Sequence, residues 1–403
     1  MRARPRWALI SLLGAISGLS AFGMASVVPA LPVLGRAFDA DSAGLQFIVS
    51  GYLLGLGLFQ PIQGLLCDRF GRRPVLLAGV TLFACASLAA TLADSLPLLA
   101  AARMLQAMGV SVATVVTRAI VRDTHGPEDG AVALAFITAV MGVAPIVAPV
   151  AGGLVSAAWG WRGVFGLHAA IAALLLLWML ALLRESRPAA TQAMSFAQLL
   201  SGFSVLLRDR VFLGYSLTYS FISAGGFAFI TVGAALFGRL FGTPPVTFGL
   251  LWAVMALAYL LGAATAGQLA RRHGSRVIIR RGLQLNLLAA TAFVAAALLP
   301  QPSQPAFMMA LMMQTAANGL VSPLCLSGCV SERPDLAGVA SGLSSATAMI
   351  ISMLCAAASG LAFDGGPGSV AVLTVICAVG ATLSARLALG HGAAQVQGKG
   401  GGR

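Results

Sequence analysis

The chain has 403 residues, of which 59% are hydrophobic and only 9% are charged. Its mean hydropathy is +0.92. A chain this apolar has more apolar surface than one soluble core could bury, which excludes an ordinary soluble globular protein. A net charge of +13 is also found in nucleic-acid-binding proteins, but the placement of the basic residues, given below, argues against that class. The composition predicts an integral membrane protein.

Apolar runs of about 20 residues, the length that a helix needs to span a bilayer, recur between short charged or Gly/Pro-containing breaks. They are continuously apolar, which favours helices over barrel strands. The first run follows three arginines as in a secretory signal, but the later runs favour a retained anchor. The twelve predicted spans are 7–30, 44–66, 74–93, 97–119, 131–155, 163–183, 211–236, 246–270, 277–299, 304–329, 338–362 and 368–390.

The basic residues predict the orientation of these spans. With the amino terminus in the cytoplasm, all Lys and Arg except Arg36, Arg103, Arg162 and Arg239 fall in cytoplasmic segments. This is the positive-inside distribution, so the basic excess reports topology rather than a nucleic-acid partner. We expect a multi-pass protein with both termini in the cytoplasm.

The spans divide into two halves of six. GLLCDRFGRR at 64 returns as GQLARRHGSR at 267, about half the chain later. An even number of spans per half gives parallel repeats, which usually enclose a solute path. The predicted fold is all-α, a polytopic membrane protein with two parallel six-helix repeats. The predicted domains are an amino-terminal half 1–183, a cytoplasmic linker 184–210, a carboxyl-terminal half 211–390 and a disordered cytoplasmic tail 391–403.

No enzymatic constellation is found in the sequence. There is no phosphate-binding or dinucleotide-binding glycine pattern, so ATP-driven transport and cofactor chemistry are not expected. Cys325 and Cys329 lie one helical turn apart, but no histidine is near them in sequence, and we expect them to pack as small apolar residues rather than to bind a metal. The sequence therefore predicts no metal and no cofactor.

Three spans carry polar residues on one narrow face. In the fourth span, a helical step of about 100° aligns such a face around Arg103. A charge inside a span is costly unless it meets a cavity or a partner, so we expect this face to line a substrate cavity; outward snorkelling of Arg103 is the alternative. For the other two spans the alternative is interhelical hydrogen bonding without solute contact. The predicted cavity residues are Arg103, Gln106, Val110, Thr114 and Thr117, then Tyr215, Thr218, Tyr219 and Ser223, then Gln314, Asn318 and Ser322.

The stretch GLLCDRFGRRP at 64–74 concentrates charge at the end of the second span. Gly71 permits a tight turn, and the arginines fit the positive-inside rule. Asp68 does not fit that rule. A carboxylate there needs an arginine or the amino end of another helix as its partner.

This stretch resembles the signature between helices 2 and 3 of the major facilitator superfamily. RMLQAMG from Arg103 is similar to that superfamily's helix-4 element, and APVAGG from Ala148 is similar to its helix-5 antiporter signature, of which Pro149, Gly152 and Gly153 remain. Together the motifs resemble the bicyclomycin- and chloramphenicol-resistance branch of the twelve-span drug:proton antiporters. The resemblance implies a monomeric, proton-coupled exporter of small molecules in the bacterial inner membrane, working by alternating access.

The resemblance also implies a cytoplasmic gate. Asp68 is expected to meet the amino end of the eleventh span, near Leu336 to Gly338, and Arg72 is expected to pair with Asp123 or Asp68. The chain departs from the family pattern at Ser26, near which related exporters often carry an acid. The predicted gate residues are Gly64, Asp68, Arg69, Gly71, Arg72, Arg73 and Asp123.

All twelve acidic residues fall in loops or at span ends, so the predicted cavity holds no carboxylate. It should favour neutral or anionic hydrogen-bonding solutes over cations. The alternatives to a drug exporter are an exporter of sugar or amino-acid derivatives and, more remotely, a membrane sensor or scaffold that transports nothing. The candidate proton carriers are His168 and the span-end acids Asp39, Asp41, Asp94 and Asp364.

Overall fold

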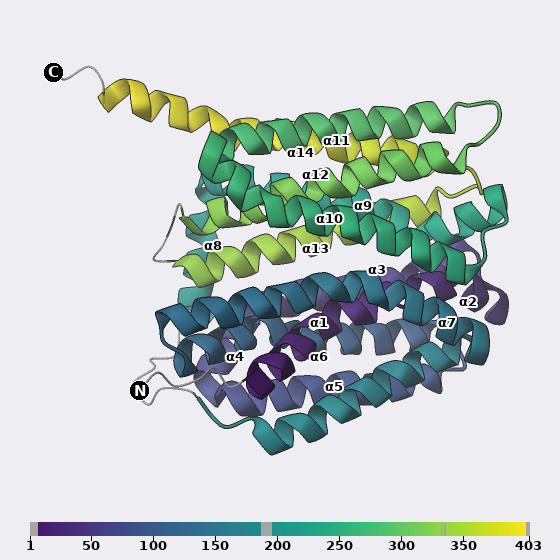
Figure 1. Ribbon diagram of the computed structural model, residues 1–403, viewed down its shortest axis with the longest axis horizontal. Coiled ribbons are helices and arrows are strands. Elements are labelled where there is room, and N and C mark those ends of the chain that lie inside the picture. The colour runs from purple at the N-terminus through teal and green to yellow at the C-terminus, as the bar shows by residue number, and fades with distance from the viewer. Residues whose placement is uncertain (1–6, 187–195, 332, 334–335, 400–403) are drawn as a thin grey trace. The chain divides into compact units, whose positions relative to one another are not determined.

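The computed structural model describes residues 7–186, 196–331, 333 and 336–399. Part of the predicted linker, 187–195, and the end of the predicted tail, 400–403, lie outside the described residues. The predicted gate residue Gly64 lies in a described helix, but its contacts are not described. The described residues form helices and no strand, which confirms the all-α prediction (Figure 1).

The helices follow one another with short connections. The first group is α1 (Trp7–Ala25), η1 (Val28–Ala30), α2 (Leu31–Ala37), α3 (Ser42–Phe59), η2 (Gln60–Ile62), α4 (Gln63–Phe70), α5 (Arg72–Thr91), α6 (Leu96–Thr124) and α7 (Pro127–Leu182). The second group is α8 (Phe196–Arg208), α9 (Arg210–Phe241), α10 (Pro245–His273), α11 (Ser275–Ala297), α12 (Gln304–Ser331), α13 (Ala337–Leu361) and α14 (Gly368–Lys399).

Eleven helices among the described residues are long and apolar enough to cross a membrane. One of them, 132–182, covers two predicted spans, 131–155 and 163–183. Gly160 lies between these spans with a φ of 68° and a ψ of −173°, which is not helical, so α7 consists of two helices joined at this glycine. Each of the twelve predicted spans therefore coincides with a helix.

The chain forms two compact units. Unit 1 contains the residues up to 196 together with Thr243–Ala253, and unit 2 contains Ala197–Gly242 and the residues from 254 onward. The division at 196 falls inside the predicted linker. The start of α10 belongs to unit 1 because it packs on α7, where a Cβ on Gly249 would lie only 2.5 Å from the carbonyl oxygen of Pro149.

Small residues allow the helices of unit 1 to approach closely. Gly79 of α5 and Gly109 of α6 face each other so tightly that a Cβ on either would overlap the carbonyl oxygen of the other. Close approach through small residues is a common means of packing helices in lipid. It brings the polar residues of α5 and α6 within hydrogen-bonding distance.

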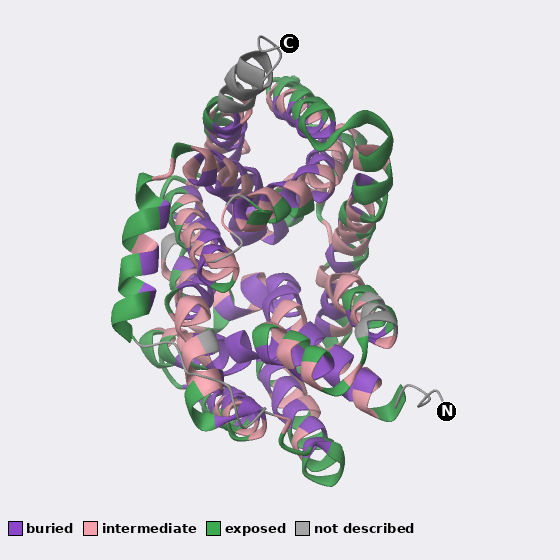
Figure 2. Cartoon of the chain, turned by 90° about the vertical axis from the view of Figure 1, so that its left-hand side faces the viewer, coloured by how far each residue is buried: buried purple, intermediate pink, exposed green. Residues whose placement is uncertain are grey.

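In unit 2, α9 packs against α12, α13 and α14. Cys325 lies in an apolar cluster with Ile222 and Leu283, while Cys329 lies in a second cluster with Phe212. No group of His, Cys, Asp and Glu that could hold a metal is present among the described residues. Figure 2 shows buried residues turned toward neighbouring helices and exposed residues on the outward faces.

Candidate functional site

The turn between α4 and α5 is built on Gly71. Its φ of 97° is in the region that favours glycine, and its N–H donates to the carbonyl of Cys67 at 3.1 Å. α4 thus ends and α5 begins within one residue. The turn places the side chains of both helix ends beside the end of α6.

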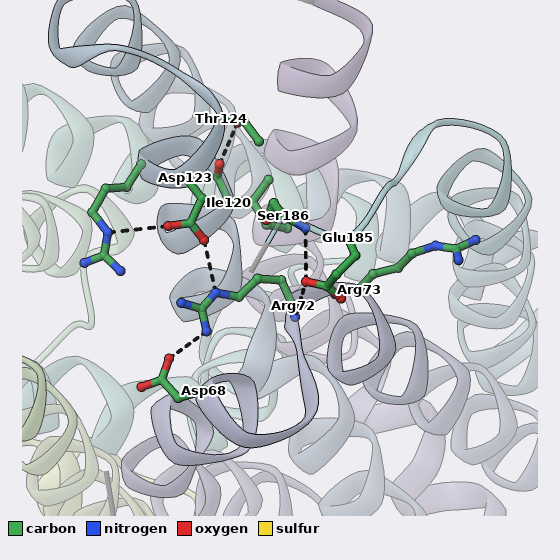
Figure 3. Close-up of polar contacts among 9 residues, drawn as sticks. Asp68, Arg72, Arg73, Ile120, Asp123, Thr124, Glu185 and Ser186 are labelled. Atoms are coloured by element: carbon green, nitrogen blue, oxygen red, sulfur yellow. Dashed lines mark hydrogen bonds and ion pairs between the residues drawn. The ribbon is translucent and has the colours of Figure 1, made fainter. Parts of the chain in front are cut away.

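Arg72 joins these three helix ends (Figure 3). Its side chain is 2% exposed, its Nη1 donates to Asp68 Oδ1 at 2.6 Å, and its Nε donates to Asp123 Oδ2 at 3.2 Å. Arg72 therefore binds both Asp68 and Asp123, which the sequence predicts as alternative partners. Asp123 is 6% exposed and Asp68 is 30% exposed, so the Asp123 bond is the better shielded from water.

Glu185, which follows α7, binds the amino end of α5. Its carboxylate accepts hydrogen bonds from the backbone N–H groups of Arg72 at 3.0 Å and of Arg73 at 3.2 Å, as Figure 3 shows. α5 has no cap from its own N-cap residue, Gly71. Glu185 therefore satisfies two N–H groups that the helix leaves unpaired and places a negative charge at the positive end of its dipole. Sequence reasoning missed this contact.

The remaining residues of this region differ in their contacts and in their exposure. Gln63 Nε2 donates to the hydroxyl of Ser111 on α6. Cys67 is buried, and this burial raises the pKa of its thiol to about 12. Arg69, which is also a predicted gate residue, is exposed, and its guanidinium lies 5.6 Å from the ring centroid of Phe70. Arg73 contributes its backbone N–H to Glu185.

A second polar cluster lies deep in unit 1 around Arg103. The side chain is 1% exposed, so outward snorkelling is wrong. Its Nη1 donates to the carbonyl of Gly23 at 3.0 Å and to Gln106 Oε1 at 2.9 Å. The guanidinium carbon lies 4.0 Å from the ring centroid of Tyr52, a cation–π contact. Gln106 in turn donates to Ser87 at 2.7 Å, which ties α6 to α5.

No carboxylate pairs with Arg103 among the described residues, and its Nε has no hydrogen-bond partner there. The buried charge is balanced by a backbone carbonyl, a side-chain amide and a π face. These neutral partners leave the site positive. Such a site attracts the negative end of a solute and repels a cation.

His168 lies next to this cluster, within a group of aromatic rings from Phe22, Phe83 and Phe165. The Ser26 hydroxyl donates its one proton to the carbonyl of Phe22 at 2.7 Å. It must therefore accept from His168 Nε2, which also lies at 2.7 Å, and this assigns the proton of a neutral imidazole to Nε2. Nδ1 has no hydrogen-bond partner within the described chain.

The comparisons with known proteins agree with this arrangement. The profile of the Major Facilitator Superfamily matches residues 13–357. The chain belongs to this superfamily. A transporter of the superfamily from Bacillus subtilis (strain 168) is 31% identical over 299 residues, which cover 73% of each chain.

Two further relatives carry names of drug resistance. The chloramphenicol resistance protein of Pseudomonas aeruginosa is 31% identical over 282 residues, 68% of this chain and 65% of that one. Multidrug resistance protein D of Escherichia coli (strain K12) is 28% identical over 353 residues, 87% of each chain. These names match the branch that the sequence motifs resemble.

Solved structures of transporters show the same fold. A bacterial homolog of the human lysosomal transporter Spinster, in an inward-facing and occupied conformation, has a TM-score of 0.76 with 17% identity, and it covers 96% of this chain and 97% of that one. A D-xylose-proton symporter has a TM-score of 0.73 with 17% identity, with 94% and 97% covered. The chain is thus a multi-pass membrane transporter by family and fold.

The helix-5 signature of the superfamily forms close contacts in unit 1. A Cβ on Gly152 would overlap the carbonyl of Ser26, and one on Gly153 would lie 3.1 Å from the carbonyl of Pro245. Together with the contact of Gly249 on Pro149, these glycines hold α7 against the end of α1 and the start of α10. The signature residues therefore serve close helix packing here.

The other residues predicted for the cavity divide into buried and accessible ones. In α6, Val110 and Thr117 are buried, while Thr114 is half-buried. In unit 2, Thr218 donates to the carbonyl of Gly214, and Ser322 donates to Asn318 Oδ1 at 2.5 Å. Ser223 and Gln314 are buried, and Tyr215, Tyr219 and Asn318 are half-buried. A cavity formed by residues of both units stays a prediction, as does the contact of Asp68 with Leu336 to Gly338.

The span-end acids have different surroundings. Asp41 caps α3 by accepting from the N–H of Gly44 at 2.8 Å, and Asp364 accepts from the N–H of Gly366 at 2.9 Å. Asp39 and Asp94 are exposed. None of these four lies inside a helix that could cross the membrane.

Proposed function

We propose that this chain is a secondary active exporter that moves small neutral or anionic solutes, of the amphenicol or bicyclomycin type, out of a bacterial cell. It lies in the inner membrane with both termini in the cytoplasm and works as a monomer by alternating access. The drug-resistance names of the relatives and the helix-4 and helix-5 elements support the export role. The positive-inside distribution supports the orientation.

The proposed preference for neutral or anionic solutes over cations rests on the buried Arg103. It is a full positive charge with neutral partners in unit 1. A cationic solute brought near it in a low-dielectric site would meet a repulsion of several kcal/mol with no carboxylate to offset it. A neutral or anionic solute with a hydrogen-bond acceptor would instead add to the ligands of the guanidinium.

Proton antiport is part of the proposal and rests on the family resemblance. His168 is a weak candidate carrier because a proton on Nδ1 would create a second buried positive charge across the ring of Phe165, which Arg103 also contacts. The exposed acids Asp39 and Asp94 stand at the ends of spans, where a water-filled vestibule can reach them. We therefore propose that a span-end acid exchanges the proton.

Expression in a pump-deficient host tests the export role. Cells are challenged with chloramphenicol and bicyclomycin and are also loaded with labelled sugar and amino-acid derivatives. The proposal predicts raised resistance to at least one of the two antibiotics, with lowered drug accumulation that returns when the pH gradient is collapsed. Export of a labelled metabolite without any drug resistance would contradict it.

A further inference from the structure

A groove of roughly 480 Å³ lies between α11 and α14 of unit 2. α11 lines it with Arg280 and Leu287, and α14 lines it with Thr382, Arg386 and Leu389. These positions follow the three- and four-residue steps of one helical face on each helix. α11 begins and α14 ends on the left in Figure 1, so the two helices run antiparallel. Arg280 therefore lies toward the same mouth of the groove as Arg386 and Leu389.

The floor of the groove is apolar. Leu283 and Ala385 line it and belong to the buried cluster around Ile222, and Leu389 packs against that cluster. Beside the groove, Leu383 and Leu387 of α14 are exposed on the surface of the unit. An apolar channel on an outward apolar surface is suited to hydrocarbon chains rather than to water.

The two guanidiniums at the mouth are exposed, and neither has an ion pair or hydrogen bond among the described residues. No acidic side chain lies between Asp364 and Arg403 in the sequence, and none of those that the structure describes lines the groove. Asp209, at the start of α9, is engaged with Arg333 and with the amino end of its own helix. The groove is therefore a positively charged mouth above an apolar channel.

We propose that this groove binds an anionic phospholipid, with the phosphate between Arg280 and Arg386 and one acyl chain along Leu283 and Leu287. The side-chain amide of Gln284 offers a further hydrogen bond to the headgroup and ester region. Basic pockets between transmembrane helices on the cytoplasmic side bind anionic headgroups in this way. The site is separate from the predicted solute cavity, because none of the predicted cavity residues lines the groove.

Lipid binding is measured on the purified full-length chain in detergent, by native mass spectrometry and by thermal stabilisation with added lipid. The probes are phosphatidylglycerol, phosphatidylcholine and inorganic phosphate. Phosphatidylglycerol should bind and stabilise the protein, and the other two should not. Stabilisation by inorganic phosphate alone, or equal binding of phosphatidylcholine, would overturn the proposal.

Two sets of variants locate the site. Arg280→Gln with Arg386→Gln should weaken phosphatidylglycerol binding about 30-fold, because the phosphate loses both of its guanidinium partners. The matched control, Arg272→Gln with Arg276→Gln, removes the same charge from exposed positions at the start of α11 and the end of α10 and should bind as the wild type does. Thr382→Phe fills the channel with the charges intact and should also weaken binding. An equal loss in the control pair, or full binding by Thr382→Phe, would refute the groove.

Discussion

Removal of Asp123 should destabilise the protein more than removal of Asp68, although both bond Arg72. Asp123 is 6% exposed, and Asp68 is 30% exposed. A shielded hydrogen bond between charged groups contributes about 1.5–3 kcal/mol, so we expect Asp123→Ala to lower the free energy of unfolding by about 2 kcal/mol. An ion pair in contact with water contributes at most about 1 kcal/mol, so Asp68→Ala should cost less than that.

The assay is thermal unfolding of the purified variants in detergent, followed by tryptophan fluorescence. A double-mutant cycle with Arg72→Gln separates the bond from other effects. In the Arg72→Gln background, Asp123→Ala should lose most of its cost because its buried partner is already gone, and its other partner, Arg122 at 3.9 Å, is 76% exposed and contributes little. The reasoning is refuted if Asp68→Ala is the more destabilising change, or if Asp123→Ala costs as much in that background as in the wild type.

Asp68 also allows an effect on transport to be separated from an effect on stability. If Asp68 acts at the gate, as the family resemblance implies, Asp68→Asn should slow efflux while expression and solute binding remain near wild-type levels. Turnover unchanged from the wild type in Asp68→Asn would contradict that role.

Three further predictions concern unit 1. Glu185→Gln should lower the free energy of unfolding by about 0.5–1 kcal/mol because a charge leaves the amino end of α5, whereas Asp94→Asn, at an exposed site, should change it little; equal effects would contradict the capping role. Ser26→Asp would place a carboxylate beside His168 Nε2 and should raise ethidium efflux, with Ser26→Asn as the uncharged control; equal efflux by both would argue against the charge account. Cys67 should resist maleimide labelling in the folded protein up to about pH 9, because burial raises the pKa of its thiol and keeps it protonated, and labelling as fast as in the unfolded chain would show the thiol to be accessible.

Much of the fold follows from the sequence because few backbone structures can satisfy their hydrogen bonds within a lipid bilayer. Each apolar run long enough to cross a bilayer became a helix, and Gly71 marked a turn because few other residues adopt its φ. The pairing of Arg72 with Asp68 was accessible because the two are four residues apart, across one turn. Apolar runs, turn glycines and charge pairs four residues apart can all be recognised in short stretches of sequence.

Contacts between distant residues were harder to predict. Glu185 is 113 residues from Arg72, and Ser26 is 142 residues from His168, so no periodicity links either pair. One signal was present for the first pair. A helix that begins directly after Gly71 has unpaired N–H groups and no cap of its own, which requires an acceptor from elsewhere in the chain. A long separation in sequence likewise concealed Tyr52 as the aromatic partner of Arg103.

The charge preference of the solute is the central claim, and efflux from proteoliposomes tests it most directly. The purified protein is reconstituted, and chloramphenicol and ethidium fluxes are compared in the wild type and in Arg103→Gln. The wild type should transport chloramphenicol and exclude ethidium, and Arg103→Gln should lose chloramphenicol transport relative to the wild type. Ethidium efflux by the wild type at a rate that matches chloramphenicol would contradict the account.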